Sequence, residues 1–513
     1  MLDADQANAF RNPRGPVEAT GTAWLRWVLW ISIASLGMAR IAAASGELWF
    51  DELLSLKLVA KAGSVTEVLR LNVDNNHPLN SVWLLLLGAS AGDLACRALA
   101  VTAGIGAMVV FLLLLRETES GSGVNRWQPL AGTFIFGCSY LQVLYASEAR
   151  GYAPCVFFSL VAFLLLLRHG RRAATNSAPF LYGAACAAAV LSHPIGIQAV
   201  LGGITWSCVG AKEEPTKLSS RLASALRWHA APAAFCVIHY VLFLRSVTIV
   251  GGDTWSPAGA ISAASLHTFG IPESAGVVGT ILVLAALTVA WADEWRRDRS
   301  LAAALLVTIV VAPCLALLVA PEGPRYPRYW LASCTFAQLL AACAVSRVLA
   351  RNRAFPRLAV LALLAATSVC NAGRIHSLLS AGRASYEQAL RHIRAGAGKE
   401  TAFVGGDHDM RHLLSLERYA PRVARFTVNG TEVSPGPLPA IDFVSSENWP
   451  AAAGAGPGWL LLLRTDGAKW PPDQLRAPHG DFYMRDAAFS RAPLSGWDLI
   501  VYRKVNVQVV PSG

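Results

Sequence analysis

Long apolar runs alternate with short polar segments through about the first 375 residues of the chain, and the alternation stops after that point. Many of the runs approach the roughly 20 residues that an α-helix needs to cross the hydrocarbon core of a bilayer. The pattern predicts eleven spanning helices, near residues 23–45, 94–115, 130–147, 151–167, 179–194, 195–210, 230–250, 275–292, 301–320, 329–345 and 357–374.

Basic residues gather in every second loop between these predicted helices. The basic loops lie at residues 116–126, 168–172, 212–227, 296–299 and 347–357. Cytoplasmic loops carry an excess of Lys and Arg, so the N-terminal tail (1–22) and these loops are predicted to be cytoplasmic. The intervening loops then face the opposite side, together with the C-terminus. They lie at 46–80, 148–150, 193–194, 251–274 and 321–328.

The apolar stretch at residues 79–91 does not fit the pattern of a spanning helix. As a helix it would be about 20 Å long, which is short of the roughly 30 Å hydrocarbon core. If it did cross, every later loop would change sides and the basic loops would face outward. We therefore predict an interfacial or re-entrant helix inside one long extracytoplasmic loop, 46–93.

The last part of the chain, 375–513, is rich in Pro, Gly and charged residues. Its short apolar runs, at 401–406, 458–464 and 497–505, are bounded by turn residues and predict strands. The predicted fold is therefore an all-α polytopic membrane bundle (23–374) of about eleven spans with interfacial helices. A small extracytoplasmic α/β domain (375–513) follows it.

Composition agrees with a multi-pass protein of the inner (cell) membrane, surrounded by lipid. The chain is 54% hydrophobic and 15% charged, with a mean hydropathy of +0.42, whereas soluble proteins are about 25% charged. This excludes a cytosolic enzyme, a secreted disulfide scaffold and a disordered chain. The net charge of +11 does not indicate nucleic acid, because much of the basic excess lies in the loops that set topology. The ten cysteines lie in or beside apolar segments without a CxxC pair, so neither disulfides nor a zinc site is predicted.

Two acidic or polar motifs lie in the loop at 46–93. Asp51 and Glu52 follow Trp49-Phe50, and on a helix their side chains point about 100° apart. The pair is consistent with a helix start at the membrane surface, or with two carboxylates that serve different partners. The second motif joins Asp74 and His77 to Pro78, and its Pro and Asn residues also suit a helix start.

Two further motifs lie in later extracytoplasmic loops. Glu148 and Arg150 lie between two apolar runs, and would form either an interfacial salt bridge or part of a site. Arg328-Tyr329 lies in an Arg-aromatic loop, where a guanidinium suits bidentate binding of phosphate or contact with lipid headgroups. A second His-Pro pair, His193-Pro194, reads as a turn at the same membrane face.

Taken in order, these motifs resemble the GT-C glycosyltransferases. Their order is similar to the pattern of the bacterial branch that contains aminoarabinose transferases and protein O-mannosyltransferases. That pattern has Asp-Glu after the first helix, His-Pro before a surface helix, Glu-x-Arg-x-Tyr and a late Pro-Arg-Tyr. The resemblance covers roughly residues 23–345. This chain has His77-Pro78-Leu79 where the family usually has His-Pro-Pro, so the start of the surface helix differs. The C-terminal domain is variable in the family, and the resemblance does not extend to it.

The resemblance implies transfer of a sugar from a polyprenyl-phosphate donor to a hydroxyl of an envelope glycolipid, polysaccharide or protein. It implies Asp51 as the catalytic base, with Glu52 as the second catalytic candidate. Arg150, Arg328 and Tyr329 would bind the donor phosphate, because fixed positive charge stabilises a leaving phosphate.

Asp74, His77 and Glu148 are candidates to orient the acceptor or to bind a metal. Asp51 and His77 would be ligands if a divalent ion such as Mg²⁺, Mn²⁺ or Zn²⁺ takes part, and their spacing leaves the metal open. The rival function is a lipid-linked sugar flippase or transporter, and a third is a scaffold whose outer domain binds a partner. Transporter sites, however, lie near the bilayer midplane, whereas these motifs lie at one membrane face.

Overall fold

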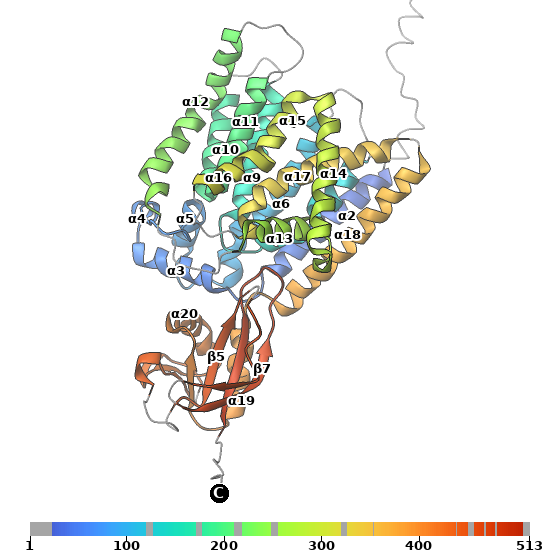
Figure 1. Ribbon diagram of the computed structural model, residues 1–513. Coiled ribbons are helices and arrows are strands. Elements are labelled where there is room, and N and C mark those ends of the chain that lie inside the picture. Colours follow the sequence, from blue (N-terminus) through green and yellow to red (C-terminus); the bar gives the residue numbers. More distant parts are fainter. Residues whose placement is uncertain are drawn as a thin grey trace, which may run out of the picture.

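The structure is a computed structural model that describes residues 23–118, 127–170, 177–209, 218–247, 255–319, 326–351, 353–437, 439–449, 456–465, 468–477 and 480–505. A large helical bundle is followed by a β-sheet domain that lies against one end of the bundle (Figure 1). This architecture confirms the predicted fold class of a helical membrane bundle with a C-terminal α/β domain.

Helices occupy all eleven segments in which spanning helices were predicted. They are α2 (Ala23–Ala43), α6 (Asp93–Thr118), α7 (Gln128–Gly132) with η2 (Thr133–Gly137) and α8 (Tyr140–Ala146), α9 (Tyr152–Gly170), α10 (Ala178–Ser192), α11 (Ile197–Val209), α12 (Leu218–Leu242), α14 (Gly276–Arg297), α15 (Arg299–Leu306) with η6 (Val307–Val311) and α16 (Ala312–Val319), α17 (Leu331–Ala350) and α18 (Ala354–Ala381). The last of them, α18, continues past the domain boundary predicted at residue 375.

Several of these helices are long and apolar enough to cross a membrane. Among the described residues six qualify by length and composition, or seven if the pair formed by α7–η2 and α8, bent by 62°, is one span. The others are shorter or less apolar, so eleven crossings remain a prediction. Large apolar side chains such as Val277, Leu318 and Phe355 are exposed on the outer helices. Such a surface fits a multi-pass protein in contact with lipid.

Three short helices form the long loop between α2 and α6. They are α3 (Phe50–Ala62), α4 (Val65–Leu69) and α5 (Pro78–Leu87), and they lie at the end of the bundle next to the sheet domain (Figure 1). Helix α5 begins with Pro78. Proline has no backbone N–H, and the first position of a helix has no intrahelical partner for one. Its ten residues extend about 15 Å, too short to cross a bilayer. This agrees with the predicted interfacial or re-entrant helix.

The C-terminal domain is a mixed eight-stranded sheet with helices α19 (Tyr386–Ala397) and α20 (Asp409–Tyr419). Its strands are β1 (Ala402–Gly406), β2 (Phe426–Val428), β3 (Thr431–Ser434), β4 (Ile441–Phe443), β5 (Trp459–Arg464), β6 (Gln474–Arg476), β7 (Phe482–Phe489) and β8 (Asp498–Val505). The strand order is β3-β2-β4-β1-β5-β8-β7-β6, with β2, β4, β1 and β5 parallel. The three runs predicted as strands correspond to β1, β5 and β8.

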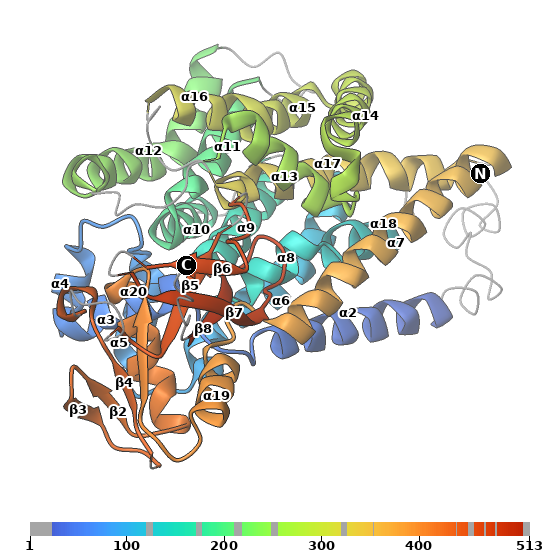
Figure 2. The same cartoon turned by 60° about the horizontal axis from the view of Figure 1, so that its bottom comes forward.

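The sheet domain is bound to the loop that carries Asp51. One buried hydrophobic cluster joins Leu48 and Leu56 of this loop to Tyr386 and Tyr419 of the domain. The Leu48 amide donates to the Tyr419 hydroxyl at 2.6 Å, and Figure 2 shows α20 beside α3. The position of the Asp51 loop therefore depends on the C-terminal domain.

Glu47 adds a polar contact to the same interface. Its two carboxylate oxygens accept the backbone N–H groups of Tyr386 and Glu387, at 2.9 and 3.0 Å, in the first turn of α19. Burial raises the pKa of Glu47 from its ordinary value of 4.5 to about 7, because it outweighs the two N–H groups that favour the carboxylate.

This raised pKa makes a prediction about stability. The folded protein holds the Glu47 proton more tightly than the unfolded chain, so this contribution is complete below about pH 4.5 and is lost as the pH rises through about 7. We expect the Tm to fall across this window in the wild type and to fall less in Glu47→Gln. Thermal unfolding of purified protein between pH 4.5 and 8 measures the difference. Identical pH slopes for the two proteins would contradict the assignment.

A second prediction concerns topology. A cysteine at position 432 of β3, in a thiol-free background, is expected to react with an impermeant reagent from the extracytoplasmic side. A matched cysteine at position 297, at the end of α14, is expected to react only from the cytoplasm. Glu432 and Arg297 are both about half exposed, so access through the protein is similar. Labelling of position 432 from the cytoplasm would overturn the arrangement.

Candidate functional site

The first turn of α3 sends two adjacent carboxylates into different surroundings. Asp51 has a side chain that is 18% exposed, whereas the Glu52 side chain is fully buried. Glu52 closes the start of the helix, because its Oε2 accepts the Trp49 amide at 3.0 Å. The 100° between neighbouring helical positions thus separates an accessible carboxylate from an inaccessible one.

Glu52 is bound by groups of the protein on both oxygens. Arg97 of α6 donates from Nε to Oε1 at 2.8 Å and from Nη2 to Oε2 at 2.6 Å, and the Ala149 amide donates to Oε1 at 2.6 Å. Although burial acts to raise the pKa of Glu52, the Arg97 guanidinium lowers it. This geometry favours a role in holding α3 against α6 over the catalytic role expected from the sequence.

The Arg97–Glu52 pair leads to a prediction about stability. Arg97→Ala is expected to lower the free energy of unfolding by about 3–5 kcal/mol, because it leaves a buried carboxylate without its partner. Arg168→Ala removes a partly exposed ion pair with Glu117, at 2.7 Å, and is the matched control. It is expected to cost about 0–1 kcal/mol. Thermal unfolding in detergent compares the two, and equal losses would contradict the structural role.

Asp51 lies between two arginines that come from distant parts of the chain. Arg150, from the turn between α8 and α9, contacts Asp51 Oδ2 through Nη1 at 2.7 Å. Arg328, from η7 (Pro327–Trp330), approaches the same oxygen through Nη2 at 3.7 Å. Asn75 fixes the arrangement, since it donates to the Asp51 backbone carbonyl at 2.7 Å and accepts from Arg150 Nη2 at 2.9 Å. Two cations and one carboxylate leave a net positive charge.

Both arginines keep donor capacity that the described residues do not use. The Nε atoms of Arg150 and Arg328 are buried and have no hydrogen-bond partner among the described residues. The Arg328 guanidinium lies 4.1 Å from the centre of the Tyr326 ring and 5.7 Å from that of Tyr329, which holds its plane. Planar guanidiniums with spare N–H groups are well suited to phosphate oxygens.

An imidazole and tyrosine cluster lies beside the arginines. His77 stacks on His193 with ring centres 5.0 Å apart, and Tyr152 lies 5.4 and 4.6 Å from the two rings. Tyr329 faces His193 at 5.7 Å. Burial, aided by the positive charge of Arg150, lowers the pKa of both histidines well below the ordinary value. Both imidazoles are therefore neutral at physiological pH.

His193 was read from the sequence only as a turn, and the structure brings it into the site. Its Nδ1 accepts the Ile195 amide at 3.1 Å, which is the local contact that makes it resemble a turn residue. Trp497 was not singled out at all. Its ring, from the C-terminal domain, lies 5.1 Å from Phe50 and 6.3 Å from Trp49. The second His-Pro pair was a usable signal for His193, whereas nothing local indicated Trp497.

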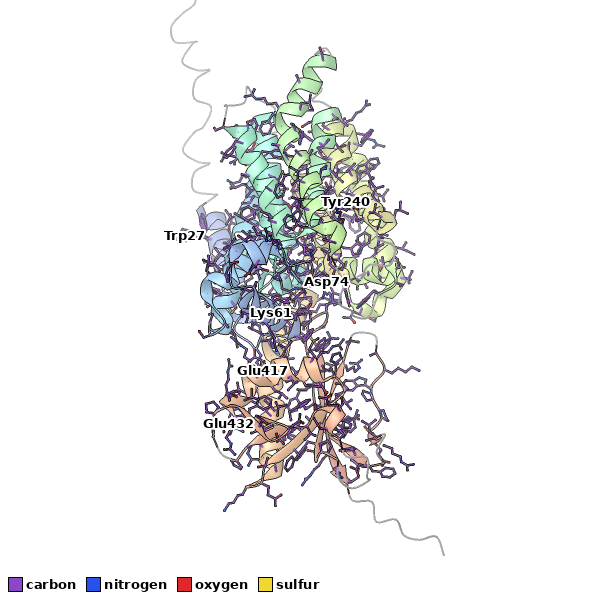
Figure 3. The ribbon with its side chains drawn as sticks, turned by 90° about the vertical axis from the view of Figure 1, so that its left-hand side faces the viewer. Trp27, Lys61, Asp74, Tyr240, Glu417 and Glu432 are labelled. Carbon is purple, nitrogen blue, oxygen red and sulfur yellow. The ribbon has the colours of Figure 1, made fainter. Side chains whose placement is uncertain are left out.

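Glu148 and Asp74 lie in surroundings that differ from those of Asp51. Glu148 is buried, its Oε1 lies 3.5 Å from Nε of Arg383, and burial raises its pKa. Arg383 belongs to the segment between α18 and α19, and it also donates to the Leu144 carbonyl at 2.7 Å. Asp74 is half-buried in the turn before α5, near the junction with the sheet domain (Figure 3). Glu148 therefore connects the site to the outer domain.

The candidate ligands do not fit a divalent metal ion. No group of three or more His, Cys, Asp or Glu side chains with metal-binding geometry occurs in the part of the chain that the structure describes. The accessible oxygen of Asp51 is engaged by Arg150 and faces Arg328, and His77 lies in the positive field of both. A divalent cation at Asp51 and His77 would have to displace or oppose two guanidiniums.

Comparison with known proteins gives similarities of structure. No protein-family model and no curated protein matches the sequence. ArnT from Cupriavidus metallidurans bound to undecaprenyl phosphate is similar over 95% of this chain and 99% of its own, with a TM-score of 0.46 and 12% identity. The Archaeoglobus fulgidus oligosaccharyltransferase tethered with an acceptor peptide has a TM-score of 0.44 and 13% identity over 76% of this chain.

This chain spans 63% of the length of that oligosaccharyltransferase. The S. cerevisiae protein O-mannosyltransferase Pmt1-Pmt2 complex bound to the sugar donor is similar over 45% of this chain and 36% of its own, with a TM-score of 0.33 and 17% identity. All three are GT-C glycosyltransferases, the family that the sequence motifs resemble.

Proposed function

We propose that this chain is an integral membrane glycosyltransferase that moves a sugar from a polyprenyl-phosphate donor to an acceptor hydroxyl on the extracytoplasmic side. The acceptor would be an envelope glycolipid, a polysaccharide or a protein. The observation that carries the proposal is the convergence of Arg150 and Arg328 on Asp51 at one end of a membrane bundle. The ArnT structure contains undecaprenyl phosphate, and the mannosyltransferase complex is bound to its sugar donor. Both descriptions are consistent with the proposal.

The charges at the site match the charge that the reaction develops. A sugar phosphodiester carries one negative charge, and the polyprenyl phosphate that leaves carries up to two. In the resting site Arg150 is bound to Asp51, and Arg328 lies close to it. When the donor phosphate binds to these two guanidiniums in place of Asp51, the Asp51 carboxylate becomes free to act as a base. Fixed cations then stabilise the leaving group more strongly than they stabilise the donor.

In the transfer step, Asp51 receives the proton and the two arginines receive the leaving phosphate. The acceptor oxygen attacks the anomeric carbon while Asp51 takes the hydroxyl proton. The bond between the anomeric carbon and the phosphate oxygen breaks, and its electron pair leaves with the phosphate, held by Arg150 and Arg328. Displacement from the opposite side of the sugar would invert the anomeric carbon. The neutral His77 and His193 border the arginines without adding a charge that would compete for phosphate.

The test follows both products of the reaction. Purified protein in liposomes is given a polyprenyl-phosphate sugar labelled in the sugar, together with an envelope extract as acceptor. The proposal expects polyprenyl phosphate to be released in step with sugar bound to acceptor, and both to be lost in Asp51→Asn. Movement of intact donor across the bilayer without cleavage would indicate a flippase and would overturn the proposal.

A further inference from the structure

A second cavity lies between the bundle and the C-terminal domain, apart from the arginines around Asp51. It has a volume of about 450 Å³, within the roughly 300–1,000 Å³ of small-molecule sites. The bundle contributes α13 (Pro257–Phe269) and the start of α14 to its wall, and the domain contributes the end of β5 and the loop that joins β7 to β8. Figure 1 shows the sheet domain reaching the end of the bundle beside α13.

The loop between β7 and β8 connects this cavity to the site at Asp51. Leu494 lines the cavity, and Trp497, three positions later, contacts Phe50 next to Asp51. The Pro493 carbonyl accepts the Tyr140 hydroxyl of α8, which anchors the loop to the bundle. On the bundle side α13 packs against η7, which carries Arg328. The β7–β8 loop and α13 therefore each join the cavity wall to a residue or element of the proposed site of sugar transfer.

The cavity loop is held in an unusual conformation. Leu494 has a φ of 57°, a left-handed backbone conformation that a residue with a large side chain rarely adopts. Gly496 has a φ of 49°, and a Cβ atom there would lie 1.7 Å from the Arg383 carbonyl oxygen, so only glycine permits this approach. Strain of this kind is concentrated at ligand-binding and catalytic sites.

The charged groups of the cavity hold one another in place through hydrogen bonds and ion pairs. Arg464 donates to Asp498 Oδ2 at 2.5 Å, and the Arg491 amide donates to Asp498 Oδ1 at 3.0 Å. On the opposite wall Glu273 lies 3.2 Å from His267 and its side chain is well exposed. The formal charges of the two arginines and the two carboxylates cancel. The set favours an uncharged ligand with many hydrogen-bonding groups over a phosphate or another polyanion.

The remaining wall is aromatic and apolar. Trp255, Leu266 and Leu494 supply it, and Ser262 adds a hydroxyl. A lipid chain would remove water from these charged groups without offering them any hydrogen bond in return. An extended peptide would pair with a free strand edge, yet β5 is paired with β1 and β8, and β8 with β5 and β7. A neutral sugar ring offers both an apolar face and hydroxyl groups, and so matches both kinds of wall.

We propose that this cavity binds a neutral saccharide unit of the acceptor, so that the acceptor is an envelope glycan or the glycan part of a glycolipid and not a protein side chain. The proposal rests on the proposed function for the meaning of "acceptor", but binding itself requires no donor and no turnover. It assigns acceptor selection to α13 and the β7–β8 loop, while the donor phosphate is bound by Arg150 and Arg328.

The test measures binding in the absence of donor. The probe is the neutral oligosaccharide fraction released by mild acid from the envelope of the cells that make this protein, labelled with a fluorophore at the reducing end. Binding to the full-length protein in detergent is followed by fluorescence anisotropy. We expect saturable binding to the wild type, weakened at least about 10-fold in Ala263→Trp, which fills the cavity, and several-fold in Glu273→Gln.

The matched control is Ala258→Trp, which places the same bulk on the same helix outside the cavity lining. It is expected to bind like the wild type, and the Tm of each variant checks that it is folded. Absence of saccharide binding would overturn the proposal, as would equal binding by Ala263→Trp and Ala258→Trp. Displacement of the saccharide by a pool of Ser- and Thr-containing decapeptides would also overturn it, in favour of a protein acceptor. Since no outcome depends on transfer, failure here is distinct from failure of the glycosyltransferase proposal.

Discussion

Asp51→Asn is expected to lower the rate of sugar transfer by about 10²–10⁴-fold, the usual contribution of a general base. Asparagine has the size of aspartate and keeps an oxygen that can accept a hydrogen bond from Arg150, so the loop should retain its conformation. Its amide cannot take the acceptor proton at neutral pH. Single-turnover transfer by purified protein, with donor binding measured separately, gives the effect on the chemical step.

The informative control is Glu52→Gln, because it removes one negative charge from the neighbouring position. Glu52 is bound to Arg97 and to the Ala149 amide, out of reach of an acceptor. We expect this variant to lose stability while each folded molecule keeps most of its turnover. If Glu52→Gln loses turnover without losing stability and Asp51→Asn transfers normally, the base has been assigned to the wrong carboxylate.

The fold was largely predictable because its main signals are local. Length and hydropathy locate a membrane helix within its own residues, so all eleven predicted segments are helical. The strands β1, β5 and β8 carry apolar runs and were predicted, whereas the three-residue strands β2, β4 and β6 are too short to show a pattern. The end of α18 was predicted at residue 374, but the helix continues to Ala381. Polar residues such as Arg374 are accommodated there because they donate hydrogen bonds to backbone carbonyls of a neighbouring segment.

The site was predictable only in part, because its roles are set by contacts between distant segments. The sequence singled out Asp51, Arg150 and Arg328, and the structure brings them together. It could not tell which carboxylate of Asp51-Glu52 is accessible, since the buried one is selected by Arg97 on another helix. The contribution of Trp497 comes from packing between two domains, which no local pattern encodes.

The second large effect is expected for Arg328→Lys, which keeps the positive charge but loses the planar guanidinium. The unused donor of Arg328 and its stacking on Tyr326 prepare it to bind two phosphate oxygens, whereas an ammonium group is a point charge on a flexible chain. A hydrogen bond between charged groups contributes about 1.5–3 kcal/mol, so we expect donor KM to rise about 10- to 100-fold. Steady-state transfer over a range of donor concentrations measures it.

Arg328 is a cleaner test of phosphate binding than Arg150. Arg150 also holds Asp51 and Asn75, at 2.7 and 2.9 Å, so its replacement would disturb the base and lower kcat as well. Arg328 stands 3.7 Å from Asp51, so its replacement should leave the base in place. The effect should come through the phosphate alone, as a higher donor KM and as a lower kcat where the leaving group loses a hydrogen bond. Arg485→Lys, at an ion pair with Asp473 on the outer domain, is the matched control and should leave the kinetics unchanged. If Arg328→Lys has the donor KM and the rate of the wild type, Arg328 is an anchor to lipid headgroups and the leaving phosphate is held by Arg150 without it.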